Sequence, residues 1–341
     1  MTSPMQAYHI TGTSGLDSLR IVETAPPIAA AGQVVVQIRS VSLNYRDYMN
    51  ILGIRGVTGP IPRIPCSDGA GEIISLGTGV TTWQVGDRVV IPFMPSWLDG
   101  PFSQAHSAAA LGGAVDGVLR QQIAVSADSL VRLPDAMTFS QAATLPCAAV
   151  TAWDALIVRG QLQAGSTVLI QGSGGVSIFA LQIAKHHGAR VLAITSSDQK
   201  AARLQELGAD ATFNYKQNPD WATWALEQTG GIGVDHVVEI GGPETLNRSI
   251  QATRFGGHIA LIGVLTGTSG EIQTVQILRK GIRLDGVYVG SRAMLAKVVD
   301  FFSTSSLTPI IDSTFPFSDA AAAVNHLESG SHFGKIVITV D

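Results

Sequence analysis

The chain of 341 residues has little cysteine, little charge and no long apolar run, and each shortage excludes a class of protein. Two cysteines are too few for a disulfide framework, which favours a reducing compartment. Charged residues make up 14% with a formal net charge of −4, so nothing favours binding to nucleic acid or to an anionic membrane. The N-terminus lacks a basic start followed by an apolar stretch, and residues 171–184 are too short and too interrupted to span a bilayer. We therefore expect a cytoplasmic protein with no nucleic-acid or membrane partner.

What the chain does contain is 45% hydrophobic residues and 37 glycines, a globular composition rich in tight turns. Its length suits two domains. Up to about residue 130, short apolar runs at 33–43, 69–77 and 87–93 are separated by Gly and Pro, which indicates mainly β-structure. From about residue 140, strand patterns alternate with helical ones, which predicts a right-handed parallel sheet with helices on both faces.

The alternating part predicts strands at 167–172, 190–195, 211–215, 235–242, 258–264 and 283–290, with helices at 176–188, 198–209 and 220–231. The last 40 residues predict helices at 293–303 and near 319–329, then a strand at 335–340. A terminal strand needs partners, and we assign it to the N-terminal β region. The predicted domains are then 1–148 with 291–341, and 149–290.

A glycine-rich turn follows the strand at 167–172 and opens the next helix. Glycine permits the tight turn and lets the backbone approach a pyrophosphate, whose charge the helix N-terminus stabilises. The third position of this dinucleotide fingerprint is Ser177 rather than Gly, and a plain strand-to-helix turn is the alternative. The candidate coenzyme-binding residues here are Gly172, Ser173, Gly174, Gly175, Val176 and Ser177.

The end of the next strand indicates which nicotinamide coenzyme binds. An NAD enzyme places an acid there to bind the ribose hydroxyls, whereas this chain has Thr195. Ser196, Ser197 and Lys200 offer two hydroxyls and a cation to a 2′-phosphate, so we expect NADPH. Asp198 could face the ribose and weaken that preference, and either serine could instead cap the following helix.

At this point the chain resembles the medium-chain dehydrogenase/reductase superfamily over nearly its full length. The resemblance implies an α/β protein with a GroES-like β-rich catalytic domain, a doubly wound parallel-sheet Rossmann domain, an active site in the cleft and hydride transfer. Besides the glycine-rich turn, it rests on SLNYRDYMNILG (42–53), PCSDGAGEIISLGTGVTTWQVGDRVV (65–90), AATLPCAAVTAWDAL (142–156), GVDHVVEIGG (233–242) and HFGKIVITV (332–340).

The positions that hold catalytic zinc in related alcohol dehydrogenases differ here. The resemblance places Asn44, Ser67 and Cys147 where those enzymes have Cys, His and Cys, and Asp68 where they have a Glu. One of three ligands survives, and the two cysteines cannot build a four-cysteine structural site. We expect no metal; a rearranged site of Cys66, Asp68 and Cys147 is the alternative.

The catalytic candidates cluster at the same motifs, by resemblance to zinc-free quinone oxidoreductases and enone reductases. Asn44 could orient the nicotinamide carboxamide or donate to the substrate oxygen, with a loop-stabilising bond as the alternative. Tyr45 and Arg46 could each donate to a developing oxyanion; Tyr45 is the better acid, and we expect one of the two in the cleft and one packed. Ser67 and Asp68 would line the vacated metal pocket.

Two neighbouring charged residues have structural interpretations. Asp47 should bond backbone or pair with Arg46 or Arg63, and Arg63 is expected to be solvated.

Further coenzyme contacts are implied by resemblance and by the carboxyl ends of the strands, where such folds bind ligands. Cys147, more a buried small side chain than a nucleophile, and Thr151 would flank the nicotinamide. The other candidates are Gly241, Gly263 and Val264 at strand ends; Val289, Gly290 and Ser291 at the nicotinamide end; and Phe333, Gly334 and Lys335 closing over the coenzyme.

Together these features predict a zinc-independent, NADPH-dependent oxidoreductase that transfers hydride to an activated carbonyl, enone or quinone. Without a Lewis acid, hydrogen bonds alone must meet the oxyanion charge, which favours activated acceptors. The alternatives are a zinc-free alcohol dehydrogenase or aldehyde reductase, and a non-catalytic NADPH-binding protein. A homodimer joined through strands near 259–264 and 283–289 is expected by resemblance. The sequence does not name the small-molecule substrate, nor choose between C=O and C=C reduction.

Overall fold

The computed structural model describes residues 4–12, 15–54 and 61–340 and divides into two compact units. Unit 1 comprises Met1–Val150 and Val289–Asp341, and unit 2 comprises Thr151–Tyr288. Residues 1–3, which begin the segment where we expect no signal peptide, lie outside the described residues.

Unit 2 is built on a six-stranded sheet in the order β10-β9-β8-β11-β12-β13, with every pair parallel. This is the doubly wound Rossmann order 3-2-1-4-5-6, and it confirms the predicted fold class. The strands are β8 Thr167–Gln171, β9 Arg190–Thr195, β10 Ala211–Asn214, β11 Val234–Glu239, β12 Thr253–Leu261 and β13 Arg283–Gly286. Buried aliphatic residues fill the four central strands, whereas the edge strands β10 and β13 have no fully buried residue.

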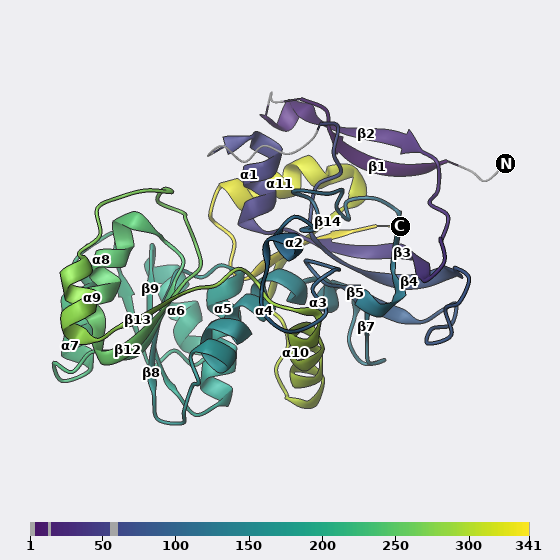
Figure 1. The fold of residues 1–341 in the computed structure, drawn as a ribbon. Coiled ribbons are helices and arrows are strands. Elements are labelled where there is room, and N and C mark those ends of the chain that lie inside the picture. Colours follow the sequence, from purple (N-terminus) through teal and green to yellow (C-terminus); the bar gives the residue numbers. More distant parts are fainter. Residues whose placement is uncertain (1–3, 13–14, 55–60, 341) are drawn as a thin grey trace. The chain divides into compact units, whose positions relative to one another are not determined.

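Helices cover both faces of this sheet, as the crossover connections require (Figure 1). One face carries α5 Gly175–His186 and α6 Asp198–Glu206, and the other carries α7 Trp221–Gln228, α8 Pro243–Ala252 and α9 Thr274–Lys280. The first three predicted helices are present. Helices α8 and α9 were not anticipated, because their apolar residues are few and they lie between strands in segments rich in Gly, Ser and Thr.

Unit 1 is a β-rich GroES-like fold. Its main sheet has the order β14-β15-β3-β4-β5-β7, with β6 paired to β3, among the described residues. Its strands are β3 Gln33–Ser42, β4 Asp68–Leu76, β5 Arg88–Ile91, β6 Gln122–Ser126, β7 Val131–Arg132, β14 Ile311–Pro316 and β15 Lys335–Thr339. A separate antiparallel pair consists of β1 Met5–Ile10 and β2 Leu19–Thr24.

The C-terminal strand β15 pairs antiparallel with β3, with Val337 opposite Ser42, which confirms the predicted return of the chain to the N-terminal β region. Its other neighbour, β14, was not anticipated. The helices of unit 1 are α1 Tyr45–Leu52, α2 Gln104–Ser107, α3 Phe139–Ala143, α10 Arg292–Thr304 and α11 Ala320–Glu328. The yellow α11 lies beside the purple α1 in Figure 1, so both ends of the chain build this unit.

A helical segment with irregular turns runs from Phe139 to Arg159 and includes π-helical stretches at Leu145–Ala149 and Asp154–Arg159, with α4 Val150–Trp153 between them. Such π turns recur at functional sites, and Cys147 lies in the first. Among the residues that the structure describes, no helix combines the length and the apolarity needed to cross a bilayer.

Candidate functional site

Asn44 stands where strand β3 gives way to helix α1, and it is the helix N-cap. The helix starts here because Asp47 Oδ2 accepts a hydrogen bond from Asn44 N at 2.8 Å, which satisfies a donor at the helix start. Asp47 is fully buried, and burial raises its pKa to about 6. Its predicted backbone bond is confirmed, but no ion pair joins it to Arg46 or Arg63 among the described residues.

Arg46 is packed rather than presented to a ligand. Its Nη1 donates to Leu111 O at 2.6 Å, and its guanidinium lies 4.5 Å from the centre of the Phe93 ring. Through these contacts Arg46 stabilises the 93–113 segment. A guanidinium engaged in this way argues against the predicted catalytic role of Arg46. Tyr45 is half-buried with its ring 5.5 Å from that of Tyr48, and it stays the acid candidate of the pair.

Ser67 and Asp68 are fully buried and bonded to each other. Ser67 Oγ donates to Asp68 Oδ1 at 2.7 Å, and the backbone N–H of Cys147 donates to Asp68 Oδ2 at 2.9 Å. Burial raises the pKa of Asp68, although Lys335 and hydrogen bonds oppose the shift. The structure therefore brings together the motif positions 44, 67, 68 and 147, with Asp68 fixing the Cys147 backbone.

The two thiols are not poised for chemistry. Burial raises the pKa of both Cys66 and Cys147, with Asp68 adding to the shift. Cys66 belongs to the hydrophobic core of unit 1, at a left-handed φ of 69° that is unusual for a residue with a side chain. The alternative site of Cys66, Asp68 and Cys147 is not formed, since no three His, Cys, Asp or Glu side chains gather as metal ligands in the described part of the chain.

Lys335 is buried and makes contacts that its own sequence segment did not indicate. Only 3% of it is exposed, and its Nζ donates to Leu43 O and to Asn44 Oδ1, each at 2.5 Å. No carboxylate lies within ion-pair distance of Nζ among the described residues. These bonds hold the Lys335 side chain against the end of β3, and its predicted coenzyme contact stays a prediction. We call this set the Asn44 cluster: Asn44, Asp47, Ser67, Asp68, Cys147 and Lys335.

Arg63 also differs from expectation. It was predicted to be solvated, yet only 3% of it is exposed, and its Nη1 donates to Gly113 O at 2.7 Å. Burial lowers the pKa of its guanidinium. The acceptor, Gly113 O, is a backbone atom 50 residues further along the chain, so the sequence around Arg63 could not reveal this contact.

The glycine-rich turn in unit 2 has the backbone that a pyrophosphate needs. Gly172 adopts a left-handed φ of 73°, and Gly174 caps α5 without a side-chain hydrogen bond, so the N–H groups of the first helical turn remain available to an anion. Ser177, at the third fingerprint position, is fully buried, and its Oγ donates to Gln171 O at 2.5 Å. Ser177 therefore closes the turn, whereas Gly172 to Val176 keep their predicted place at its rim.

A buried carboxylate, Glu239, organises the adjacent turn after β11. Its Oε1 accepts from Gly241 N at 2.8 Å, Gly242 N at 2.9 Å and Thr245 Oγ1 at 2.6 Å. Its Oε2 accepts from Gln171 Nε2 at 2.7 Å and, by a short bond, from Ser249 Oγ. Sequence reasoning missed Glu239, although an acid inside the apolar strand VVEIGG was a usable signal.

The end of β9 shows how the candidate 2′-phosphate residues lie. Thr195 is buried, and Ser197 Oγ caps α6 by accepting from Lys200 N at 3.2 Å. Both carboxylate oxygens of Asp198 are bonded, to Asn214 Nδ2 and Gln217 Nε2, each at 2.8 Å. Ser197 therefore takes the capping role, its hydroxyl proton is still free to be donated, and Asp198 is held by amides of its own unit.

The remaining candidates fall in turns with tight packing. A Cβ on Gly263 would lie 1.9 Å from Ile240 O, so the turns after β11 and β12 touch, with Gly241 and Val264 beside them. Thr151 is buried. Val289 holds a left-handed φ of 62°, a strained conformation for a β-branched residue.

Four more candidates belong to unit 1. Ser291 caps α10, Gly290 leaves room for Met294, and Phe333 is buried beside Gly334. Their predicted coenzyme contacts stay predictions.

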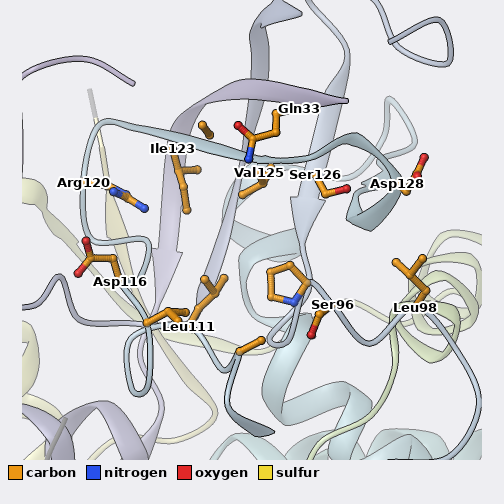
Figure 2. Close-up of a pocket in the computed structure, with 14 residues that line it drawn as sticks. Gln33, Ser96, Leu98, Leu111, Asp116, Arg120, Ile123, Val125, Ser126 and Asp128 are labelled. Atoms are coloured by element: carbon orange, nitrogen blue, oxygen red, sulfur yellow. The ribbon is translucent and has the colours of Figure 1, made fainter. Parts of the chain in front are cut away.

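A groove of about 590 Å³ lies elsewhere on unit 1. Figure 2 shows Asp116 and Arg120 on one side of it and Asp128 on the other. Part of its lining comes from the 92–113 segment, but no member of the Asn44 cluster lines it. The groove is therefore separate from the chemistry described above.

The chain matches two protein-family models. Residues 30–135 match the alcohol dehydrogenase GroES-like domain, and residues 175–304 match the model described as zinc-binding dehydrogenase. These matches fall in unit 1 and mainly in unit 2, respectively.

Similar proteins span the whole chain. A zinc-type alcohol dehydrogenase-like protein of Schizosaccharomyces pombe is 38% identical over 335 residues, covering 96% of this chain and 97% of its own. A 2-methylene-furan-3-one reductase of Solanum lycopersicum is 29% identical, covering 98% and 79%. Among solved structures, an NAD-dependent alcohol dehydrogenase superposes with a TM-score of 0.89 at 29% identity over 99% and 100% of the two chains. The quinone oxidoreductase from Coxiella burnetii superposes with a TM-score of 0.81 at 25% identity over 99% and 100%.

Proposed function

The chain belongs to the medium-chain dehydrogenase/reductase superfamily and is an oxidoreductase of that family, and we propose that it is a zinc-independent, NADPH-dependent reductase of activated carbonyls, enones or quinones. The observation that carries the proposal is the Lys335 ammonium, 2.5 Å from Asn44 Oδ1.

Zinc does not fit the Asn44 cluster, although a matching family model and a relative have zinc in their names. Asn44 and Ser67 offer neutral, weak ligands where thiolate and imidazole would be needed. Lys335 already places a cation on the Asn44 amide, and a divalent ion beside it would set like charges together in a buried site. We therefore propose that hydrogen-bond donors of the protein, rather than a metal, polarise the acceptor.

A dinucleotide fits the glycine-rich turn of unit 2, where Gly172 to Gly175 leave backbone donors at the start of the twelve-residue helix α5. When bound, NADPH supplies the hydride. The chain's own part is to hold the pyrophosphate on these N–H groups and the 2′-phosphate on Ser196, Ser197 and Lys200. Both Asp198 oxygens accept from amides of Asn214 and Gln217, so the ribose hydroxyls of NADH would have to share this carboxylate with them.

In unit 1 the Asn44 cluster would stabilise the negative charge that arises on the acceptor oxygen. Asn44 Nδ2 is a buried donor that interacts with the Asp68 carboxyl but makes no hydrogen bond of ordinary length and angle in the described residues. Tyr45 is the candidate proton donor. An enone or quinone needs less help than a plain ketone, because conjugation spreads the charge. Two of the similar proteins, the 2-methylene-furan-3-one reductase of Solanum lycopersicum and the quinone oxidoreductase from Coxiella burnetii, have names that agree with this substrate class.

The test is a steady-state comparison of NADPH with NADH on three acceptors: an enone, a quinone and an aldehyde, with a primary alcohol and NADP⁺ in the reverse direction. We expect turnover of the enone or quinone with NADPH, and no loss on dialysis against a chelator. Preference for the alcohol would support the zinc-free alcohol dehydrogenase. Coenzyme binding without turnover would support a binding protein. One tightly bound zinc per chain with chelator-sensitive activity would refute the proposal.

We also propose a cytoplasmic homodimer. Strand β13 is the edge of the unit 2 sheet, and next to it in sequence helix α9 leaves Leu278 79% exposed and Val275 54% exposed. An uncovered edge strand with apolar neighbours favours pairing with a second copy. Size-exclusion chromatography with light scattering should give twice the chain mass, and Leu278→Lys should shift it toward the monomer.

A further inference from the structure

The Asn44 side chain has a fixed polarity. A lysine ammonium has donors only, so the amide oxygen of Asn44, and not its nitrogen, must face Lys335 Nζ. Asn44 Nδ2 then points away from the lysine. That nitrogen is buried, and Asn44 itself is 9% exposed. It carries two N–H donors. The Asp68 carboxyl interacts with the Asn44 side chain, but Nδ2 makes no hydrogen bond of ordinary length and angle in the described part of the chain. Buried amide donors are nearly always paired, so the N–H that does not face Asp68 is set for an acceptor from outside the protein.

The fold delivers these two residues to each other through strand pairing. Leu43 N donates to Ile336 O at 3.0 Å, which places the end of β3 against the start of β15. Lys335 is the first residue of β15. Gly334 before it has a left-handed φ of 90°, and a Cβ there would lie 2.4 Å from Ile310 O. The pairing of β15 with β3 and the tight packing at Gly334 therefore fix the backbone position of Lys335 beside Asn44. Lys335 does not reach Asn44 as a freely moving surface side chain.

We propose that Lys335 is a positioning residue, which holds the Asn44 carboxamide so that Nδ2 donates to the oxygen of the reducible substrate; this rests on the proposed function. The substrate class that fits is a ligand with a carbonyl oxygen whose negative charge grows during reduction. Lys335 also polarises the amide through Oδ1, so the Nδ2–H bond strengthens as that charge appears. An interaction that strengthens in the transition state raises kcat more than it lowers KM.

The proposal assigns Asn44 to the substrate and not to the coenzyme. The nicotinamide carboxamide also carries a carbonyl oxygen, but it gains no comparable charge in the reaction. The two sources are distinguishable because a coenzyme contact changes the dissociation constant of NADPH alone, whereas a substrate contact changes kcat.

The experiment is a double-mutant cycle on the full chain with NADPH and the best enone or quinone of the wild type. Lys335→Met and Asn44→Ala should each lower kcat by about 100-fold, the size found when one oxyanion donor is removed. KM should change less than about threefold, in keeping with an interaction made mainly in the transition state. Because Lys335 acts through Asn44, the double variant should be no slower than Asn44→Ala, to within about threefold. If Lys335 merely supported the fold, Lys335→Met would lower kcat by a further large factor in the Asn44→Ala background. That result would overturn the proposal.

Two controls separate the outcomes. The dissociation constant of NADPH, followed by coenzyme fluorescence, should stay within about threefold for every variant, since the pyrophosphate turn lies in unit 2; a large rise with unchanged kcat would mean a coenzyme contact and overturn the proposal. If Lys335→Met does not fold, Lys335→Gln replaces it, because its amide can still donate to Asn44 Oδ1 and should retain more kcat than Asn44→Ala.

A binding readout keeps the inference testable apart from turnover. Calorimetric titration of a phenolate, whose oxygen already carries the charge that arises in the reaction, into the NADP⁺ complex should show weaker binding to Asn44→Ala and Lys335→Met than to wild type. If the wild type reduces no acceptor, the proposed function fails, and the titration still decides this inference. Equal phenolate affinity in all three proteins, or no phenolate binding to the wild type, refutes it.

Discussion

Replacing Glu239 tests whether one buried carboxylate holds together the turn beside the dinucleotide site. In Glu239→Gln, one oxygen becomes an amide nitrogen. The nitrogen fits best at the Oε2 position, where Ser249 Oγ can turn to accept, but Gln171 Nε2 then faces another donor. Gln171 cannot flip without losing the bonds that its Oε1 accepts from Ile240 N and Gly241 N.

The expected loss of stability follows from the number of hydrogen bonds that the substitution removes. One hydrogen bond to a charged group is lost, at about 1.5–3 kcal/mol, while Gln171 Nε2 keeps its 3.0 Å bond to Ser249 Oγ. We therefore expect Glu239→Gln to lower the stability of unit 2 by about 2 kcal/mol. In Glu239→Ala, Gly242 N and Ser249 Oγ lose the acceptors described above, so the loss should reach about 3–5 kcal/mol.

Hydrogen exchange measured by mass spectrometry resolves the two units of the chain. Peptides from β8 and β11 should report the loss, whereas peptides from β3 in unit 1 should not change. The matched control is Glu244→Gln, an exposed acid on α8, which should alter stability by less than about 0.5 kcal/mol. A loss under about 1 kcal/mol for Glu239→Gln, or an equal loss in β3, would refute the reasoning, because the buried carboxylate would then contribute less than one hydrogen bond to a charged group.

Three further predictions concern packing, a reassigned arginine and pH. Gly263→Ala should destabilise unit 2 by more than about 2 kcal/mol because its Cβ would strike backbone, whereas Gly286→Ala has open space and should be neutral in urea unfolding. Arg46→Met should lower unit 1 stability by about 2 kcal/mol and change kcat less than tenfold; a hundredfold loss of kcat at unchanged stability would restore its catalytic role. Burial lowers the pKa of His236 and His258 from 6.5 to about 4, so the unfolded chain binds more protons between those values. Unit 2 should therefore lose stability as the pH falls from 6.5 toward 4, with a smaller loss in His258→Asn; identical pH slopes in urea titrations would contradict this.

Much of the fold could be predicted from local pattern. The runs TVLIQ and RVLAIT, each followed by helical spacing, predicted strands β8 and β9 and helices α5 and α6. Burial on both sides makes such strands continuous apolar runs, so the local composition carries the information. Helices α8 and α9 lack that signal, and β14 has a half-exposed pattern that needs its partner β15 to be recognised.

The candidate site was predictable where backbone chemistry decides it. The turn from Gly172 to Gly175 and the capping of α6 by Ser197 depend on residues within a few positions, and the structure shows both. Arg63 and Arg46 were less predictable because their acceptors, Gly113 O and Leu111 O, lie about fifty and sixty-five residues away.

By itself the sequence determined the order of strands and helices, the glycine-rich turn, and the loss of two ligands at the positions of Asn44 and Ser67, since each is written in neighbouring residues. Only the tertiary structure decided which cationic side chain lies beside Asn44. The sequence around Lys335 predicts a contact with the coenzyme. In the structure Lys335 bonds to Asn44, 291 residues earlier in the chain, because β15 pairs with β3. Which donor meets which acceptor depends on strand register, and no local pattern encodes that pairing.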